Sequence, residues 1–360
     1  MKPIPLSRPP VDDAIKQAVL AAIDSRQYIL GPQCRELERE LAKATGVAHA
    51  VLTSSATAAL WLSLRALGVS AGDELLVPSH TAFPTVEAIC FAGATPIFVD
   101  VDEWYTLDVK DAAAKATART VGIVPVHLYG QPADMPAVQD LAARLGIWVL
   151  EDCAQAQGAA WDGRRVGSFG RAAVYSFYPS KNLPVMGDGG CVLTDGDDIA
   201  ARCRRLRDHG RVSKDLHEEV GFNLRFNELQ AAAARVLLGR LDGMNDHRRA
   251  LAARYHERLT GVPLALPRER EHARHVYHLY VVRTDRRAKL AAFLEERGIQ
   301  TGIHYPVPAH RQLALAHLPA PAVPHTERLV EEILTLPISA THTFSEIDEV
   351  AAGVRDFFTR

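Results

Sequence analysis

The sequence lacks the features that would tie it to a membrane or to nucleic acid. No apolar run approaches the roughly 18 residues of a membrane span, and the start MKPIPLSRPP has no apolar secretory segment. The 41 basic and 43 acidic residues nearly cancel, to a net charge of -2, so no overall field attracts an anionic polymer or lipid surface. We therefore expect a cytoplasmic protein that binds neither nucleic acid nor membrane.

Cysteine is also scarce, with five residues and no CxxC pair, which argues against a disulfide framework and against a thiolate metal site. The segment HARHVYH superficially suggests metal binding. However, its His275 and His278 fall on opposite faces of a predicted strand and have no carboxylate or cysteine support. We assign no metal.

What is present is an alternation of short apolar runs with longer helical patterns, which is typical of βαβ units. At 360 residues the chain predicts about two domains. Helices are expected at 35–45 and 57–67, each stopped by glycine, and another spans roughly 224–242. Near-continuous apolar character predicts strands covered on both faces at 74–78, 95–99, 121–129, 147–152, 172–178 and 190–194.

Near Leu241 the sequence pattern changes to charged helical segments around one strand, which is predicted at 276–282. We interpret residues 1–242 as a large α/β domain and 243–360 as a smaller α+β domain. In open α/β sheets, ligands bind beyond the carboxyl ends of the strands, so polar residues that follow strands are the first candidates for a site.

Three segments meet this criterion. SSATAAL places hydroxyls before a helix, a plausible phosphate cradle, although a simple cap by Ser54 or Ser55 is the commoner explanation. IWVLEDCAQAQGA ends a strand with Asp152, and YSFYPSKNLPVMGDGG carries Lys181 from a strand into a glycine-rich bend. A desolvated lysine, a strand-end carboxylate and a helix N-terminus are what pyridoxal phosphate requires: the amine forms a Schiff base, the carboxylate keeps the pyridine nitrogen protonated, and the helix holds the phosphate.

Six motifs resemble those of the DegT/DnrJ/StrS family of pyridoxal-phosphate-dependent sugar aminotransferases; in chain order they are PVHLYGQPADM, EDCAQAQGA, YSFYPSKNLPVMGDGG, RLRDHGR, GFNLRFNELQAA and HYPVPAH. The resemblance implies the type I aminotransferase fold, an α/β fold with a large, mostly parallel sheet flanked by helices and a smaller C-terminal α+β domain. It also implies a homodimer with shared active sites, and residues 1–30 are expected to border the site.

Residue by residue, the resemblance makes Lys181 the Schiff-base lysine and general base, and Asp152 the partner of the pyridine nitrogen. Gln155 would bond the ring hydroxyl. The remaining cofactor contacts that it implies are Phe83 stacked on one ring face, Ala154 against the other, and phosphate ligands Thr57, the Ala58 N–H, Ser176 (with Ser180 as a competitor) and the partner's Asn223.

Two departures from the family pattern are tolerable, since Ala56 stands where many members have glycine and Cys153 where alanine is commoner. Neither departure changes the cofactor assignment.

We expect the substrate pocket to be bordered by Tyr28, His304 and Tyr305, with loop packing an equally good explanation.

The implied reaction is a ping-pong transfer of an amino group, most often from L-glutamate, to a nucleotide-linked keto-deoxysugar. A keto-cyclitol or an unactivated keto-sugar is the alternative acceptor. A dehydratase relative is disfavoured because the lysine is present, and a cofactor-binding regulator because binding alone needs no poised base.

Overall fold

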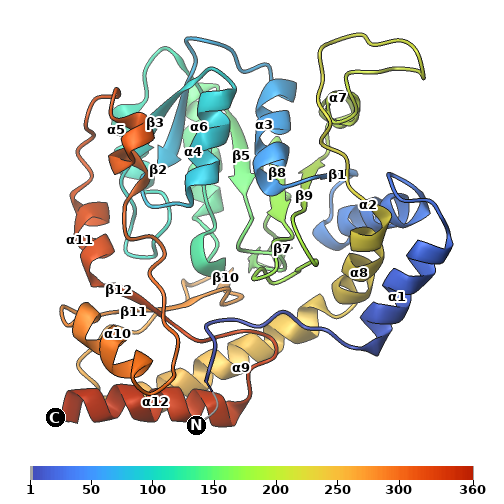
Figure 1. The fold of residues 1–360 in the computed structure, drawn as a ribbon. Helices are drawn as coiled ribbons and strands as arrows, with labels where there is room; N and C mark the ends of the chain where they lie inside the picture. Colours follow the sequence, from blue (N-terminus) through green and yellow to red (C-terminus); the bar gives the residue numbers. More distant parts are fainter. Residues whose placement is uncertain (1–2, 360) are drawn as a thin grey trace.

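A seven-stranded sheet forms the centre of the protein in the computed structural model, which describes residues 3–359. Six strands run the same way, and only β9 is antiparallel to its neighbours. In spatial order they are β1 (His49–Thr53), β9 (Gly190–Thr194), β8 (Ala172–Ser176), β5 (Trp148–Asp152), β4 (Thr120–Ile123), β2 (Glu74–Pro78) and β3 (Thr95–Val99) (Figure 1). The predicted mostly parallel sheet is confirmed.

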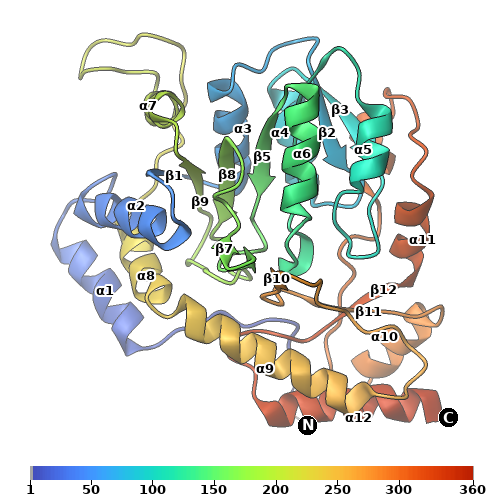
Figure 2. The same cartoon turned by 180° about the vertical axis from the view of Figure 1, so that it is seen from behind.

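Helices cover both faces of this sheet, which explains why its strands are apolar throughout (Figures 1 and 2). One face packs against α3 (Ala56–Ala66), α4 (Phe83–Phe91) and α7 (Asp197–Leu206). The other packs against α5 (Val109–Lys115), α6 (Met135–Leu145), α2 (Pro32–Thr45) and α8 (Glu228–Leu238), and α1 (Asp13–Asp24) lies on α8.

A second, smaller core lies beyond the carboxyl ends of the strands. It is built on the antiparallel pair β11 (Tyr280–Arg283) and β12 (Ile333–Leu336), with α9 (Leu241–Leu259), α10 (Arg287–Glu295) and α12 (Phe344–Thr359). The long helices α9 and α12 pack together below the large sheet in Figure 1. Between the two cores lie the short strands β6 (Ala160–Trp161), β7 (Arg164–Arg165) and β10 (Ala273–Arg274). Helix α11 (Pro324–Glu332) donates a backbone hydrogen bond to the side chain of Asp100.

Local sequence explains where most helices and strands begin and end, and it also explains where these bounds differ from the predicted ones. α2 ends at Thr45 because Gly46 takes φ +84°, a left-handed conformation that suits glycine. The strand predicted at 121–129 stops at Ile123, since Pro125 lacks a ladder donor and residues Leu128–Gly130 form a 3-10 turn. The single helix predicted at 224–242 is two helices with a break at 239–240, and the strand predicted at 276–282 covers only 280–283.

Within residues 3–359, no helix combines the length and apolarity needed to cross a membrane. The predicted division at residues 242–243 falls in the first turn of α9 and stays a prediction.

Candidate active site

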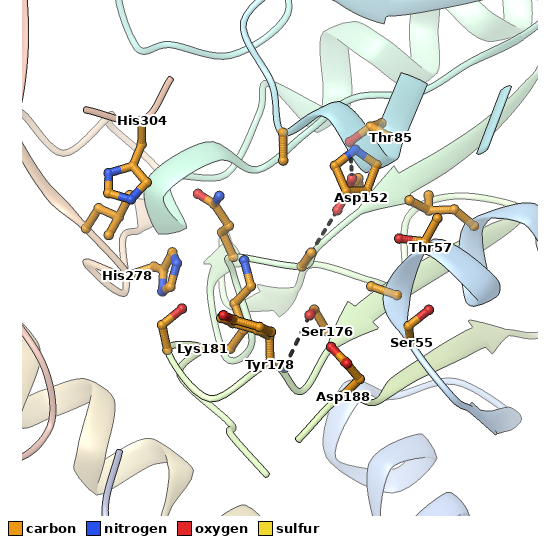
Figure 3. A pocket seen from close by; sticks show the side chains of 18 of the residues that line it. Ser55, Thr57, Thr85, Asp152, Ser176, Tyr178, Lys181, Asp188, His278 and His304 are labelled. Atoms are coloured by element: carbon orange, nitrogen blue, oxygen red, sulfur yellow. Dashed lines mark hydrogen bonds between the residues drawn. The ribbon is translucent and has the colours of Figure 1, made fainter. Parts of the chain in front are cut away.

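A cavity of about 380 Å³ opens between the carboxyl ends of the strands and the smaller core. We call its two sides the sheet wall and the loop wall. The sheet wall comprises Ser55, Thr57, Thr85, Asp152, Ser176 and Lys181, and the loop wall comprises Leu6, Ser7, His278, His304 and Tyr305 (Figure 3). Both its size and its position at strand ends are typical of ligand sites in α/β proteins.

Lys181 enters the cavity from the turn that follows β8, where its backbone N–H donates to the carbonyl of Tyr178 at 2.8 Å. Desolvation lowers the pKa of its amine to about 8, against the raising effect of the Asp152 charge. A substantial fraction of the amine is therefore neutral, and nucleophilic, near neutral pH.

Asp152 ends β5, and its side chain is held from two directions. The Thr85 hydroxyl donates to Oδ2 at 2.7 Å, and the Ala154 N–H donates to Oδ1 at 3.0 Å (Figure 3). The Thr81 hydroxyl lies 3.1 Å from the Thr85 hydroxyl, so Thr81, Thr85 and Asp152 form a hydrogen-bonded relay. The carboxylate is thus oriented before any ligand arrives.

The start of α3 and the end of β8 supply hydroxyls to one end of the cavity. Ser55 is the N-cap of α3, and its Oγ accepts from the Ala58 N–H at 3.1 Å, so the capping explanation holds for Ser55. Ala58 itself is not among the lining residues, whereas Thr57 is, as are the competing hydroxyls Ser176 and Ser180. The dipole of α3 favours an anion at this end.

The loop wall is tied to the sheet wall through Gln155. Its Oε1 accepts from the Tyr129 N–H at 2.8 Å, and its Nε2 donates to the Tyr305 hydroxyl oxygen at 3.0 Å. That bond leaves the hydrogen of Tyr305 free to donate elsewhere. Tyr129 donates to the backbone carbonyl of His304, whose Nδ1 lies 2.8 Å from Thr335 Oγ1.

The structure corrects the prediction for Phe83, which lines a separate groove with Glu87 and Leu318. α4 begins at Phe83, directly after the extended N-cap Ala82, and Ala82 and Pro84 line the cavity whereas Phe83 does not. Ala154 and Gln155 do line the cavity.

Two further predicted residues do not line the cavity of their own chain. Tyr28 is about half exposed, and its hydroxyl donates to Ile23. Asn223 lies beyond α7, where its Oδ1 accepts from the Arg225 Nε at 3.0 Å. Its role in a partner's site stays a prediction.

The three histidines of HARHVYH have separate partners. His272 pairs with Asp162 at 2.7 Å, His275 accepts the Tyr277 N–H at 2.8 Å, and His278 lines the cavity. Elsewhere, the ligand atoms of His127, Glu151 and Cys153 lie within 4.8 Å of one another, all buried.

In that cluster, His127 Nδ1 accepts the Ala133 N–H, and Glu151 accepts three backbone N–H groups from residues 167–170. Through these contacts the cluster holds the backbone at residue 133 and at residues 167–170 in place.

Sequence reasoning missed Thr85 and the loop-wall position of His278, whereas Leu6 and Ser7 belong to the segment 1–30 that the resemblance placed at the border of the site. Thr85 had a signal, since it lies in the loop-to-helix segment after β2, another strand with its carboxyl end at the cavity. Nothing local could have placed Leu6, which reaches the cavity through bonds of its backbone to Gln300 and Ile338.

The comparisons with known proteins agree with this geometry. A sequence model of the DegT/DnrJ/EryC1/StrS aminotransferase family matches residues 9–355. The chain is 42% identical to a UDP-N-acetyl-3-dehydro-alpha-D-glucosamine 3-aminotransferase of Acidithiobacillus ferrooxidans, over 96% of this chain and 94% of the relative.

It is also 42% identical to a dTDP-3-amino-3,4,6-trideoxy-alpha-D-glucose transaminase of Streptomyces venezuelae, over 95% and 92% of the two chains. Among solved structures, S. venezuelae DesV in complex with a ketimine intermediate superposes over 100% of both chains with a TM-score of 0.96 and 40% identity.

Proposed function

The chain belongs to the DegT/DnrJ/EryC1/StrS aminotransferase family, and from that premise we propose that it aminates the C3 ketone of a nucleotide-linked deoxysugar. The amino donor is L-glutamate, the cofactor is pyridoxal phosphate, and the two half-reactions follow a ping-pong order. The observation that carries the proposal is the pairing of Lys181 with the oriented carboxylate of Asp152 in one cavity.

The residues present fit pyridoxal phosphate. An amine with a lowered pKa can bond the aldehyde, and the N-terminus of α3 favours an anion. Lys181, Asp152 and Gln155 would hold the ring, and Thr57 and Ser176 the phosphate. When bound, the cofactor supplies an electron sink for the carbon that loses or gains a proton.

Lys181 acts as nucleophile and then as general base. Once its amine is displaced by the amino donor, it stays in the cavity and moves a proton from the donor's α-carbon. A pKa of about 8 keeps enough of the amine unprotonated to accept that proton, and the resulting ammonium can give it up again within the same half-reaction, so that Lys181 is neutral when the second begins.

Asp152 stabilises positive charge on the group it faces. Its two acceptor oxygens are already engaged by the Thr85 O–H and the Ala154 N–H, so the carboxylate stays in one orientation through the cycle. Such preorganisation avoids the cost of reorienting the charge during reaction.

The loop wall is proposed to hold the sugar. Tyr305 has a free donor hydrogen, and burial raises its pKa to about 12, so the hydroxyl stays protonated at working pH. His304 is neutral there, since burial lowers its pKa to about 4. The first relative is named as a 3-aminotransferase of a 3-dehydro sugar and the second as a transaminase of a 3-amino sugar, which favours a C3 ketone as acceptor.

A homodimer is part of the proposal. The segment 207–222, which we call the arm, projects beyond α7 in Figure 1 and exposes Val212, Leu216, Val220 and Phe222. A groove with exposed Leu20 and Met186 lies between α1 and the bend after Lys181. A second copy would cover these apolar groups and deliver Asn223 to the partner's phosphate site.

The keto-cyclitol and unactivated keto-sugar acceptors remain the alternatives, because the sheet wall would serve them equally. Substrate discrimination therefore requires a panel: nucleotide-linked 3-keto-sugars and 4-keto-sugars, and a keto-cyclitol, each with glutamate. We expect 2-oxoglutarate release with the 3-keto nucleotide sugar, and preferential turnover of either other class would contradict the assignment.

A second measurement tests the cofactor. Borohydride reduction of the protein with pyridoxal phosphate, followed by peptide mass spectrometry, should place the label on Lys181. A label on another lysine would refute the central role. A cofactor-binding regulator would carry the label on Lys181 but turn over none of the panel.

A further inference from the structure

Two hydrogen bonds lead from the end of β2 to the segment that carries Tyr305. His80 lies just beyond β2 and is fully buried, and its Nε2 is 2.6 Å from the Tyr129 hydroxyl oxygen. Tyr129 in turn donates to the backbone carbonyl of His304, the residue before Tyr305. We call these two bonds the His80 link. Neither His80 nor Tyr129 lines the cavity, so both can act on a ligand only through other residues.

The direction of each bond in the His80 link follows from the chemistry of its groups. A hydroxyl has one hydrogen and a carbonyl can only accept, so the hydrogen of Tyr129 points to His304. The Tyr129 oxygen therefore accepts from His80, which places the hydrogen of the neutral ring on Nε2. Burial, with smaller effects of His304 and His325, lowers the pKa of His80 to about 4 and keeps the ring neutral.

This arrangement leaves the other ring nitrogen of His80 without a bond. Its Nδ1 is buried and finds no hydrogen-bond partner in the part of the chain that the structure describes. An unpaired acceptor in the interior destabilises a fold, so an apolar side chain would serve a purely structural role better. The observation indicates that the Nε2–H of His80 has a role besides stability.

Tyr129 also holds the hydroxyl end of Tyr305. Its backbone N–H donates to Gln155 Oε1 at 2.8 Å, and Gln155 Nε2 donates to the Tyr305 oxygen at 3.0 Å. The His80 ring lies edge-on to both tyrosines, with its centroid 6.0 Å from that of Tyr129 and 6.5 Å from that of Tyr305. Tyr305 is thus held at its hydroxyl and at the preceding carbonyl, and Tyr129 is the source of both contacts.

We propose that His80 is a positioning residue for Tyr305. Its Nε2–H keeps the Tyr129 hydroxyl on the His304 carbonyl, and that bond holds the free O–H of Tyr305 toward the sugar. The inference rests on the proposed function, in which Tyr305 donates to the keto-sugar. Because the His80 link acts on sugar binding and does not contact Lys181, it should set KM and leave kcat nearly unchanged.

The first test needs neither cofactor nor substrate. With 3-fluorotyrosine placed at position 305 alone, the width of its single fluorine resonance reports whether that side chain keeps one orientation. His80→Leu should broaden the resonance, whereas His80→Gln, whose Nε2–H can replace the ring donor, should keep it narrow. Both variants lack the ring, so their difference reports the lost donor. Ser79→Ala, which breaks a bond to His310 on the same segment, should leave the resonance unchanged.

A second variant breaks the His80 link at its next member. Tyr129→Phe keeps both rings and the backbone bond to Gln155, and removes only the hydroxyl that reaches His304. It should therefore broaden the resonance as His80→Leu does. Thermal unfolding shows whether each variant is folded, and either of the two suffices for the test.

The second readout is the steady-state kinetics of the loaded enzyme. His80→Leu should raise the KM of the keto-sugar about threefold with kcat nearly unchanged, and His80→Gln should restore most of the loss. In a Tyr305→Phe background, His80→Leu should raise KM no further, because both substitutions act through one hydrogen bond to the sugar.

A narrow resonance in folded His80→Leu or Tyr129→Phe would overturn the proposal. Additive effects of His80→Leu and Tyr305→Phe on KM would also overturn it, as would a fall in kcat at constant KM, which would assign the His80 link to the chemistry. Absence of turnover by the wild-type protein would refute the proposed function, and the fluorine resonance would still decide whether His80 holds Tyr305.

Discussion

The two walls of the cavity are built in different ways. The sheet wall takes its residues from strand ends, from the turn after β8 and from the starts of α3 and α4, so backbone hydrogen bonds of the sheet and of these helices set most of their positions. The loop wall takes His278, His304 and Tyr305 from segments without strand pairing at those positions. These are fixed by hydrogen bonds to side chains of the large domain, namely Tyr129, Gln155 and Asn182.

The difference indicates a division of labour. A wall fixed by the sheet suits chemistry that every substrate shares, whereas a wall of loops can change with the substrate and leave the sheet intact. The predictions below test whether the walls separate in this way, by asking which wall controls rate, which controls titration and which controls affinity.

The sharpest test compares two adjacent acids of β5. Asp152 faces the cavity, while Glu151 faces the core and accepts N–H groups of residues 167, 169 and 170. Asp152→Asn should lower kcat by about 10²–10⁴-fold with little loss of stability, because it removes the charge and preserves the shape.

Glu151→Gln is the matched control. It should lower the free energy of unfolding by about 2–3 kcal/mol, since an amide nitrogen then faces backbone donors, and leave kcat of the folded protein within about twofold. Denaturant unfolding and steady-state kinetics check both variants. If both substitutions lower kcat alike, the two faces of β5 do not divide into one catalytic and one structural face.

The next effect is the pH dependence of cofactor attachment. The protonated form of Lys181 is inactive as a nucleophile, and a pKa of about 8 means that the attachment rate should rise about tenfold per unit below pH 8 and then level off. Stopped-flow absorbance of the cofactor-free protein measures it. The loop wall should add no second titration between pH 5 and 8, because burial lowers the pKa of His304 to about 4.

A second inflection in that interval would show that the loop wall takes part in the proton chemistry. His304→Gln provides the control, because it removes one of the two histidine rings of the loop wall and leaves Lys181 in place.

The two walls also differ in how far sequence alone predicts them. Strands at 74–78, 95–99 and 190–194 match the prediction to the residue, because an apolar run between turn residues is a local signal. Lys181 and Asp152 could be found for the same reason, since each follows such a run.

Prediction failed where orientation depends on a helix start or on a distant partner. Phe83 lies at the first residue of α4 and lines a separate groove, whereas its neighbours Ala82 and Pro84 line the cavity, and no local pattern decides between these orientations. His278 is held by a hydrogen bond to Asn182, 96 residues earlier in the chain, and no local pattern encodes that contact.

On the loop wall, Tyr305→Phe should raise the KM of the keto-sugar about tenfold and leave kcat nearly unchanged. The lost group is a hydrogen-bond donor to substrate, worth roughly 1 kcal/mol or somewhat more. The hydroxyl also accepts from Gln155 Nε2, so cofactor affinity is measured alongside by titration. A fall in kcat with constant KM would move Tyr305 from binding to chemistry.

The smallest expected effect returns to the sheet wall. Thr85→Val keeps the shape of the side chain but removes the O–H that bonds Asp152 Oδ2, so one of two bonds that orient the carboxylate is lost. The Ala154 N–H still holds Oδ1, and we therefore expect a fall in kcat of about five- to tenfold, less than for Asp152→Asn. Thr81→Val, one step further along the relay, should lower kcat about twofold.

Because both threonines act through Asp152, neither should lower kcat further in an Asp152→Asn background. Additive losses in the double variants would mean that Thr85 contacts the ligand directly, and that the sheet wall contains a second independent group.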